Sequence, residues 1–532
     1  MKALKKPFLT ALVLGMALVF VLSACSKNDN ANSGSSPSAS AGKSSTESAK
    51  PVESAKPVTL KFRMLGPGKQ ADSQVVSDEF NKRLQAVLPN TTVEFEYVRD
   101  SEYADKWKLA AAASEPIDIA WTGYLLDYPT EVNKGSYVEM DKLLEQYGQD
   151  IKKEIPSWVL DRARVNGKLY AIPNYQQAVD NRVTMRVPTE FINKGYIDPA
   201  AAQATFYKYG PVSKESFAVI EGYLEKLKAN NELRKGFTPN VLVAMMNHNM
   251  LTAPFMVQDG KVINWYDTEK EKLLIQTMSN WFAKGYIRKD MLSLQNQRQD
   301  EGKPDGSVAW FHTIGGASLE EESKKESTNR GFPVTLIPME EKFVISNLSD
   351  LTNLAIPRTS KNPERAMQLL NLLNSSKGKE LYNLLVWGIE GKHYKKTSEN
   401  RIETIGYTGQ GTTDSPYGQW SWAVGNTANS FETQSSPENF IKIWTGVNAG
   451  ATVSPLLGYK PNLDPIKTEL AQILSVVKEY AGSTAQLVLE SGALPDYQKK
   501  YDEFIDKMKK AGSDKVIAEL QKQIDEFMKT KK

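Results

Sequence analysis

The sequence predicts an α/β protein built around a parallel sheet, with two or more lobes and a helix-rich C-terminal region. Strand-like and helix-like patterns alternate between residues 58 and 121, which is typical of strands joined by helical crossovers. The chain has 532 residues, more than a single hydrophobic core usually serves. Its last segments repeat apolar residues at helical spacing.

The spacing of apolar residues sets the first elements. Residues 58–65 alternate and are rich in β-formers, so we expect a strand, which Gly66-Pro67-Gly68 ends. Five apolar residues between 73 and 88 fall on one side of a helix. The same reasoning predicts a strand at 91–98, an alanine-rich helix at 107–114 and a short strand at 116–121.

Longer loops separate the later elements. We expect a strand or hairpin arm at 167–173, helices at 216–230 and 269–284, strands at 307–311 and 351–356, and helices at 363–373, 464–480, 495–510 and 514–528. In the last helix, apolar residues from Val516 to Phe527 form one stripe. We interpret this stripe as packing against a lobe, with a partner-binding helix as the alternative.

The first 25 residues have the three parts of an export signal. A positive start is followed by an almost wholly apolar run at 8–22 and then by the small residues Ser23 and Ala24. A membrane-spanning helix needs ~20 apolar residues. The run is shorter than this, so a signal-anchor helix is the less favoured alternative.

The only cysteine, Cys25, directly follows this signal. Leu22-Ser23-Ala24-Cys25 resembles the lipobox of bacterial lipoproteins. The resemblance implies a signal peptide at 1–24, cleaved before Cys25, and a diacylglycerol on the cysteine sulfur. Two acyl chains hold a protein stably on a membrane. Residues 25–57 would then be the lipidated cysteine and a disordered tether, since Ser26 to Lys56 has almost no large apolar residue.

Composition and motifs exclude several classes of function. The 66 basic and 63 acidic residues nearly balance, so no nucleic-acid partner is expected. Residues 66–71, GPGKQA, match the dinucleotide fingerprint only loosely. Pro67 removes an amide that could face phosphate. We therefore expect no cofactor here and interpret the segment as a strand-to-helix turn whose amides line the mouth of a cleft.

Catalytic and metal-binding signatures are also missing. The sequence has no G-x-S-x-G, H-E-x-x-H or P-loop motif. His248, His312 and His393 are far apart and lack ligand spacing, so we expect no metal site and structural roles for all three. Carboxylates are plentiful, which leaves a glycosidase pair open. Nothing in the sequence picks out such a pair, and we name no catalytic residue.

Aromatic and amide residues gather at the ends of predicted strands and in the loops beyond them. Ligands of open α/β sheets bind at such loops. Aromatic faces stacked on sugar rings, with amides reaching hydroxyl groups, would form a neutral carbohydrate site. For each tryptophan, a place in the core is the alternative. The predicted ligand-binding residues are Trp121, Tyr124, Asn174, Tyr175, Trp310, Trp387, Trp420 and Trp422.

Several segments, in order, resemble the family-one extracellular solute-binding proteins, the lipoprotein components of ABC importers. AAAASEPIDIAWTGY leads into an Asp-containing strand, and EVNKGSYVEMDKLLEQYG is similar to the family's "kGafvpLddll" segment. VNGKLYAIPNYQ follows. Residues 353–394 resemble the return crossing, in which a hinge strand leads to a helix. The tail from residue 456 resembles DUF3502, a domain of unknown function in large members from Paenibacillus-type bacteria.

The resemblance implies a two-lobe, periplasmic-binding-protein-like (type II) fold. The first lobe would comprise 58–183 plus 348–410, and the second 184–347 plus 411–532 with the helical C-terminal region. Solute would be held between lobes that close by hinge bending. The closed form would dock on ABC permease subunits.

The same resemblance implies a function. Family members mostly serve oligosaccharide uptake, so we expect a monomeric, non-enzymatic binding protein, lipid-anchored on the outer face of the cell membrane. A surface-attached glycoside hydrolase or lyase is the first alternative. A structural or signalling lipoprotein whose helical tail engages a partner is the second.

Overall fold

The computed structural model describes residues 56–180, 182–239, 249–314, 319–346, 352–406, 414–483 and 486–531. The expected signal peptide, Cys25 and the tether to residue 55 lie outside these ranges, as does His248. None of the described helices is long and apolar enough to cross a membrane.

The first sheet has five strands in the order β2-β1-β3-β14-β6. Strand β1 pairs in parallel with β2 on one side and with β3 on the other, which confirms the predicted parallel β-α-β-α-β start. Strand β14 pairs antiparallel with β3 and with β6. The chain therefore leaves this sheet after β6 and returns to it at β14. The strands are β1 (Val58–Gly66), β2 (Thr91–Arg99), β3 (Ile119–Gly123), β6 (Ala171–Pro173) and β14 (Thr352–Ala355).

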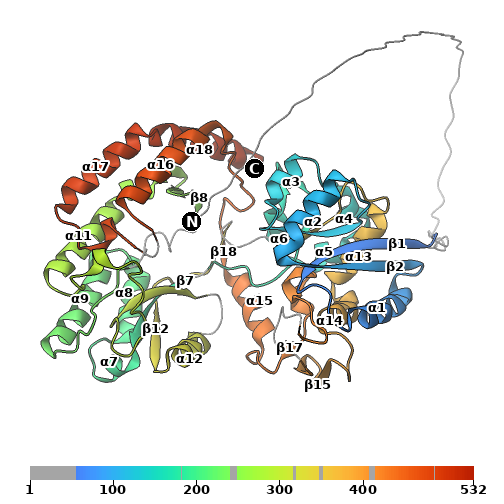
Figure 1. Ribbon diagram of the computed structural model, residues 1–532, viewed down its shortest axis with the longest axis horizontal. Helices are drawn as coiled ribbons and strands as arrows, with labels where there is room; N and C mark the ends of the chain where they lie inside the picture. Colours follow the sequence, from blue (N-terminus) through green and yellow to red (C-terminus); the bar gives the residue numbers. More distant parts are fainter. Residues whose placement is uncertain are drawn as a thin grey trace, which may run out of the picture. The chain divides into compact units, whose positions relative to one another are not determined.

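Helices cover this sheet and close the first hydrophobic core. Helix α1 packs on β2 through an edge-to-face contact between Phe80 and Phe95, whose ring centroids are 5.1 Å apart. Helix α2 begins at Asp100 rather than at the predicted Trp107, because two acidic residues in its first turn favour a helix start. Figure 1 shows α14, from late in the chain, beside α1. The helices are α1 (Ser73–Val87), α2 (Asp100–Ala112), α3 (Tyr128–Asn133), α4 (Asp141–Tyr147), α5 (Gln149–Glu154), α6 (Ser157–Arg162), α13 (Pro363–Leu373), α14 (Lys379–Trp387) and α15 (Phe440–Gly450).

The segment from residue 414 to residue 450 also belongs to the first core. Its side chains Tyr417, Phe431 and Trp444 are buried there, and the Tyr417 hydroxyl donates to the Leu385 carbonyl at 2.7 Å. The sequence analysis assigned everything from residue 411 to the second lobe, whereas these three aromatic side chains pack in the first core. Short elements in this region are β4 (Arg164–Val165), β5 (Lys168–Leu169), β15 (Tyr394–Ser398), β16 (Arg401–Thr404), β17 (Glu432–Thr433), η3 (Ser376–Gly378), η4 (Ser421–Ala423) and η5 (Thr427–Asn429).

A second core surrounds an antiparallel sheet in the order β11-β7-β12. All seven residues of the central strand β7 are buried. The predicted strand at 307–311 is displaced, because regular pairing begins only at Trp310. Trp310 therefore begins a strand rather than ending one. The elements are β7 (Arg182–Pro188), β11 (Trp310–Ile314), β12 (Val334–Pro338), α7 (Thr189–Asn193), α8 (Pro199–Tyr209), α9 (Lys214–Ala229), α11 (Glu269–Ala283) and α12 (Leu319–Arg330).

A third core joins a small antiparallel sheet, β10-β9-β8, to the C-terminal helices. Val516, Leu520 and Ile524 of α18 are buried in it, which confirms the expected packing of the apolar stripe. The elements are β8 (Met250–Thr252), β9 (Phe255–Gln258), β10 (Lys261–Asn264), α16 (Lys467–Tyr480), α17 (Tyr497–Lys510) and α18 (Ser513–Thr530), together with the short elements η1 (Trp265–Asp267), η6 (Asp464–Ile466) and η7 (Leu489–Ser491). The short elements β13 (Val344–Ile345), β18 (Thr452–Val453) and η2 (Met291–Ser293) lie outside this core.

Two buried carboxyl groups meet where α11 packs on η7. Glu271 is 0% exposed and Glu490 is 4% exposed, and the two carboxyl groups lie close enough to interact electrostatically. Burial raises the pKa of both groups, and that of Glu490 rises to about 7. A proton shared by this pair avoids placing two like charges in the interior.

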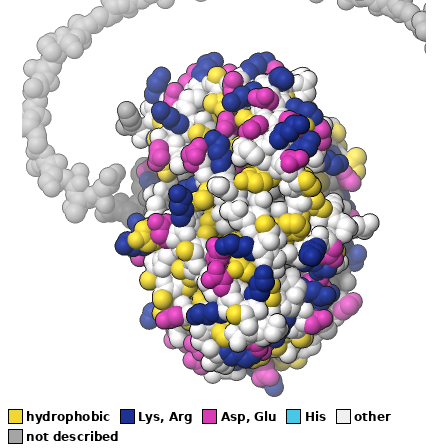
Figure 2. Space-filling model, turned by 90° about the vertical axis from the view of Figure 1, so that its left-hand side faces the viewer, with side chains coloured by type: hydrophobic (Ala, Val, Ile, Leu, Met, Phe, Trp, Pro, Cys, Tyr) yellow, Lys and Arg dark blue, Asp and Glu magenta, His cyan; other side chains and the backbone are white. Residues whose placement is uncertain are grey.

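The surface carries mixed charge. On the face shown in Figure 2, Lys and Arg side chains are interspersed with Asp and Glu side chains, and hydrophobic side chains appear between them in separate groups. This distribution agrees with the near balance of 66 basic and 63 acidic residues. Neither sign of charge dominates this face.

Candidate ligand-binding site

Tyr124, Trp420 and Trp422 form a group of accessible aromatic rings, which we call the aromatic platform. Tyr124 is 48% exposed, and both tryptophans are half-buried. The indoles of Trp420 and Trp422 stack with centroids 5.0 Å apart and an interplanar angle of 19°. The ring of Tyr124 lies 6.4 Å from that of Trp422 and is tilted by 42°. Two segments distant in the sequence thus present three neighbouring rings.

The platform tryptophans are held from below by the chain around them. The Ser421 carbonyl, between the two indoles, accepts a hydrogen bond from the Tyr382 hydroxyl at 2.9 Å. The preceding residue, Gln419, is buried, and its amide donates to the Gln70 side-chain oxygen at 3.0 Å. These contacts fix the short η4 turn on which both indoles sit.

Gln419 also explains the glycine turn that follows β1. A Cβ on Gly66 would collide with the Gln419 side-chain oxygen, so a larger residue here would require the Gln419 side chain to move. The turn at 66–68 is therefore filled by the chain's own side chain, and the loose dinucleotide fingerprint marks a packing contact. The strand-to-helix turn was predicted correctly.

Thr352, the first residue of β14, lies at the centre of the polar contacts beneath the platform. It is 5% exposed. Its hydroxyl oxygen accepts from Trp121 Nε1 at 2.7 Å and from Asn174 Nδ2 at 3.1 Å. The same hydroxyl donates to the Trp422 carbonyl at 3.1 Å. Asn174 Nδ2 also donates to this carbonyl, at 3.0 Å.

Trp121 and Asn174 support the platform rather than form its surface. Trp121 is fully buried, and its indole meets the edges of Tyr103 and Tyr124 at centroid distances of 5.5 and 5.4 Å. Asn174 is 4% exposed, and its Oδ1 has no hydrogen-bond partner among the described residues. The structure thus brings five of the eight predicted residues together, three at the surface and two beneath it.

Tyr175, Trp310 and Trp387, which the sequence analysis also named as ligand-binding residues, are buried and lie apart from this group. Tyr175 packs edge-on between Trp158 and Trp444, and burial raises its pKa. The Trp387 indole donates to the Ser430 hydroxyl at 3.0 Å within the first core. Trp310 is 0% exposed and packs in a small cluster of aliphatic side chains.

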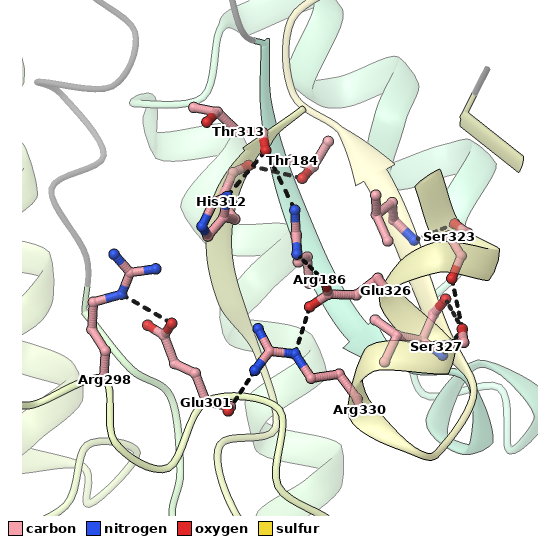
Figure 3. A network of polar contacts seen from close by, with 12 residues as sticks. Thr184, Arg186, Arg298, Glu301, His312, Thr313, Ser323, Glu326, Ser327 and Arg330 are labelled. Carbon is pink, nitrogen blue, oxygen red and sulfur yellow. Dashed lines mark hydrogen bonds and ion pairs between the residues drawn. The ribbon is translucent and has the colours of Figure 1, made fainter. Parts of the chain in front are cut away.

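A largely buried ionic network links Arg186, which lies opposite Trp310 in the second sheet, to helix α12 and to the loop around residue 300 (Figure 3). Arg186 of β7 pairs with Glu326 of α12 at 2.6 Å, and Arg330 bonds the same carboxylate at 2.8 Å. Burial alone would raise the pKa of Glu326, but hydrogen bonds from Arg330 and Arg186 outweigh it and leave this pKa below its ordinary value. Arg298 pairs with Glu301 nearby at 3.0 Å. Opposite charges are therefore matched here.

Both described histidines have structural contacts. His393 accepts from the Ile389 amide through Nδ1 and faces Asp72 through Nε2, at 2.8 and 3.1 Å. Burial lowers the pKa of His393 and that of His312. Within the described ranges, no group of three or more His, Cys, Asp or Glu residues could hold a metal ion.

The sequence analysis missed Thr352, Gln419 and Gln70. Gln70 lies inside the turn that the glycine pattern marked, so that pattern pointed to its position. Thr352 is the second residue of the predicted strand 351–356, but a lone threonine in a strand has no functional signature. Its partners Trp121 and Asn174 are 231 and 178 residues away in the chain, beyond the reach of any local motif.

Comparisons with known proteins agree with this architecture. The family described as "Bacterial extracellular solute-binding protein" matches residues 68–380, and DUF3502 matches residues 455–529. The "Carbohydrate ABC transporter substrate-binding protein" of Streptococcus pneumoniae serotype 4 is 27% identical over 463 residues, 83% of this chain and 85% of that protein.

Two solved structures show the same fold. The N-glycan transport solute-binding protein NgtS of Streptococcus pneumoniae is 25% identical with a TM-score of 0.64, covering 89% of this chain and 100% of that one. An extracellular solute-binding protein of Bifidobacterium longum subsp. infantis, 14% identical, has a TM-score of 0.54 and covers 88% and 98% of the two chains. They confirm the predicted two-lobe α/β fold. Since the family match spans more than half of the chain, this protein belongs to the bacterial extracellular solute-binding protein family.

Proposed function

We propose that this protein is the substrate-binding component of an ABC importer and that it captures an oligosaccharide on the aromatic platform. The observation that carries the proposal is the partly exposed, stacked pair Trp420–Trp422 beside the exposed ring of Tyr124. Aromatic faces bind the apolar faces of sugar rings while their polar edges stay hydrated. A platform of three rings suits a chain of sugars better than a single small ion.

The relatives support a sugar as the solute. The pneumococcal relative carries the description of a carbohydrate transporter component, and NgtS has been solved in complex with Man1GlcNAc. For the present chain, Trp420, Trp422 and Tyr124 would stack on the glycan. Trp121 and Asn174 would hold these rings in place. Tyr175, Trp310 and Trp387 would contribute to stability only.

Delivery requires further steps that we propose from the family and the sequence. The monomeric protein would close two lobes on the solute and dock on the permease subunits. The first lobe would comprise about 58–183 and 348–450, with the boundary moved to include the segment that packs in the first core. Cys25 would carry the diacylglycerol that keeps the protein on the outer face of the cell membrane.

Thermal unfolding against a panel of oligosaccharides tests the binding role. A ligand at 100 times its Kd adds ~2.7 kcal/mol of stability to the folded state. We expect an upward shift of Tm with at least one glycan, which mass spectrometry then recovers intact. A glycan recovered cleaved would instead identify a hydrolase or lyase, and no shift with any sugar would contradict an oligosaccharide solute.

The Cys25→Ala variant tests the anchor. We expect the variant to leave the membrane fraction or to accumulate as an uncleaved precursor, while its affinity for solute stays unchanged. Membrane fractionation and the mass of the N-terminal peptide are the measurements. Continued lipid-dependent membrane association of the variant would contradict the lipobox.

A further inference from the structure

We propose that Thr352 is a positioning residue for the aromatic platform, and that its hydroxyl fixes the place of Trp422 beside Tyr124. The inference deepens the proposed function and rests on it for its effect on affinity. Thr352 touches no exposed surface of the platform, so it would act through the residues it binds.

The hydroxyl group of Thr352 uses all of its hydrogen-bonding capacity. A threonine hydroxyl offers one donor and two acceptor sites. Here it donates to the Trp422 carbonyl and accepts from Trp121 and Asn174. Rotation of the hydroxyl would break at least one of these bonds. The β-branched side chain also limits rotation about its first torsion, so the hydroxyl is held in one orientation.

The position of Thr352 in the sheet also links it to Tyr124. In the antiparallel ladder with β3, Thr352 lies opposite Gly123, the residue just before Tyr124. Its carbonyl also accepts from the Asn174 amide at 2.9 Å. One residue is therefore linked through the backbone to the Tyr124 side of the platform and through its hydroxyl to the Trp422 side.

The hydrogen bonds of Thr352 are buried. Thr352 and Asn174 are 5% and 4% exposed, so water cannot easily replace a lost partner. A buried polar group left without a partner is costly. Loss of the hydroxyl would leave the Trp121 indole N–H unsatisfied and the Trp422 carbonyl with one donor fewer. The Tyr382 and Gln419 contacts would still hold the rest of the η4 turn. The Trp422 carbonyl would keep only the bond from Asn174, so the spacing between Trp422 and Tyr124 would be less firmly fixed.

Asn174 and Thr352 lie at the two points where the chain crosses between the first sheet and the second core. Asn174 directly follows β6, where the chain leaves the first sheet, and Thr352 begins β14, where the chain returns to it. The Trp422 carbonyl binds both residues. The platform is therefore tied to both ends of the excursion to the second core.

The test compares Thr352→Val, which removes only the hydroxyl in nearly the same shape, with Thr352→Ser, which keeps it. Thr122→Val is the matched control: Thr122 is also fully buried in this sheet, but its hydroxyl accepts from Tyr137 at 2.8 Å and has no bond to Trp422. The full chain, purified in detergent, is titrated with Man1GlcNAc. We expect about 10-fold weaker binding for Thr352→Val and near wild-type binding for Thr352→Ser and Thr122→Val.

A second readout needs no sugar. Near-ultraviolet circular dichroism reports how firmly aromatic rings are held, and subtraction of a Trp422→Phe spectrum in each background isolates Trp422. We expect Thr352→Val to lose much of this signal and Thr352→Ser to retain it. If Thr352→Val does not fold, Asn174→Leu removes the second donor to the same carbonyl and should show the same loss.

The outcomes separate the two proposals. If the wild type does not bind Man1GlcNAc, the choice of solute fails, while the dichroism still decides the role of Thr352. An unchanged Trp422 signal in Thr352→Val, or an equal loss in Thr122→Val or Thr352→Ser, would overturn the positioning role.

Discussion

The aromatic platform and the interior of the β11-β7-β12 sheet both carry tryptophans that the sequence analysis assigned to the binding site, yet these tryptophans differ in exposure. At the platform, Trp420 and Trp422 reach the surface. Beneath them lie the uncharged hydrogen-bonding groups of Thr352, Asn174 and Trp121. In the second sheet, Trp310 is fully buried, and the ion pair of Arg186 with Glu326 lies nearby. A tryptophan that the sequence assigns to a binding site therefore reaches the surface only where other residues fill the core beneath it.

The largest expected difference between the two regions is in stability. Trp310→Ala should lower the free energy of unfolding by about 3–5 kcal/mol, because it removes a large, fully buried side chain. Its effect on the solute affinity of the folded fraction should be negligible. Urea unfolding and glycan titration measure the two quantities, with Trp310→Phe as a milder control. A large loss of affinity with little loss of stability would return Trp310 to the binding site.

The second expected effect concerns charge. Glu326→Gln should cost about 3 kcal/mol at pH 7, since it leaves the buried Arg186 and the partly exposed Arg330 without their shared carboxylate. The pKa of Glu326 is lowered in the folded state, so its contribution is present above the unfolded pKa, ~4.3, and is lost as pH falls through the lower folded value. The difference between wild type and variant should therefore shrink in acid.

Glu490→Gln provides the contrasting case in the same set of curves. The pKa of Glu490 is raised to about 7, so the folded state keeps a proton that the unfolded chain has lost above pH ~4.3. Wild-type stability should fall relative to Glu490→Gln as pH rises from there to about 7, and then level off. Parallel curves for the three proteins would show that these carboxyl groups do not titrate as their surroundings indicate.

The smallest effect is expected at the platform itself. Trp422→Ala should weaken glycan binding by ~1–3 kcal/mol. It should lower the free energy of unfolding much less than Trp310→Ala does, because the Trp422 ring is only partly buried. Calorimetric titration measures the affinity. The affinity of the wild-type protein for the glycan should also vary little between pH 5 and 8, since Thr352, Asn174 and Trp121 beneath the platform carry no titratable group. Unchanged affinity in Trp422→Ala would break the comparison on which the account depends.

The sequence was informative where a pattern is local. Residue alternation predicted the ends of β1 and β2 to within one residue, and helical spacing predicted the bounds of α1 and α13 closely. These patterns are local because they arise within each element from the side chains that face the core. Residues 307–311 misled because an unbroken apolar run does not set register. Ala309 forms only an isolated bridge with Phe237 before regular pairing starts at Trp310.

The site was predictable in kind but not in detail. A loop rich in glycine, asparagine and serine indicated that Trp420 and Trp422 would be accessible. The packing of the 414–450 segment on the first core, and the convergence of Trp121, Asn174 and Trp422 on Thr352, depend on contacts between distant parts of the chain. No single segment carries that information.

A structure of the protein with a bound oligosaccharide tests the central claim most directly. The account predicts a sugar ring lying face-on against the indole of Trp420 or Trp422, with carbon atoms within about 4.0–4.5 Å of it, and Tyr124 contacting the same glycan. A glycan bound elsewhere, with all three rings facing solvent, would contradict it.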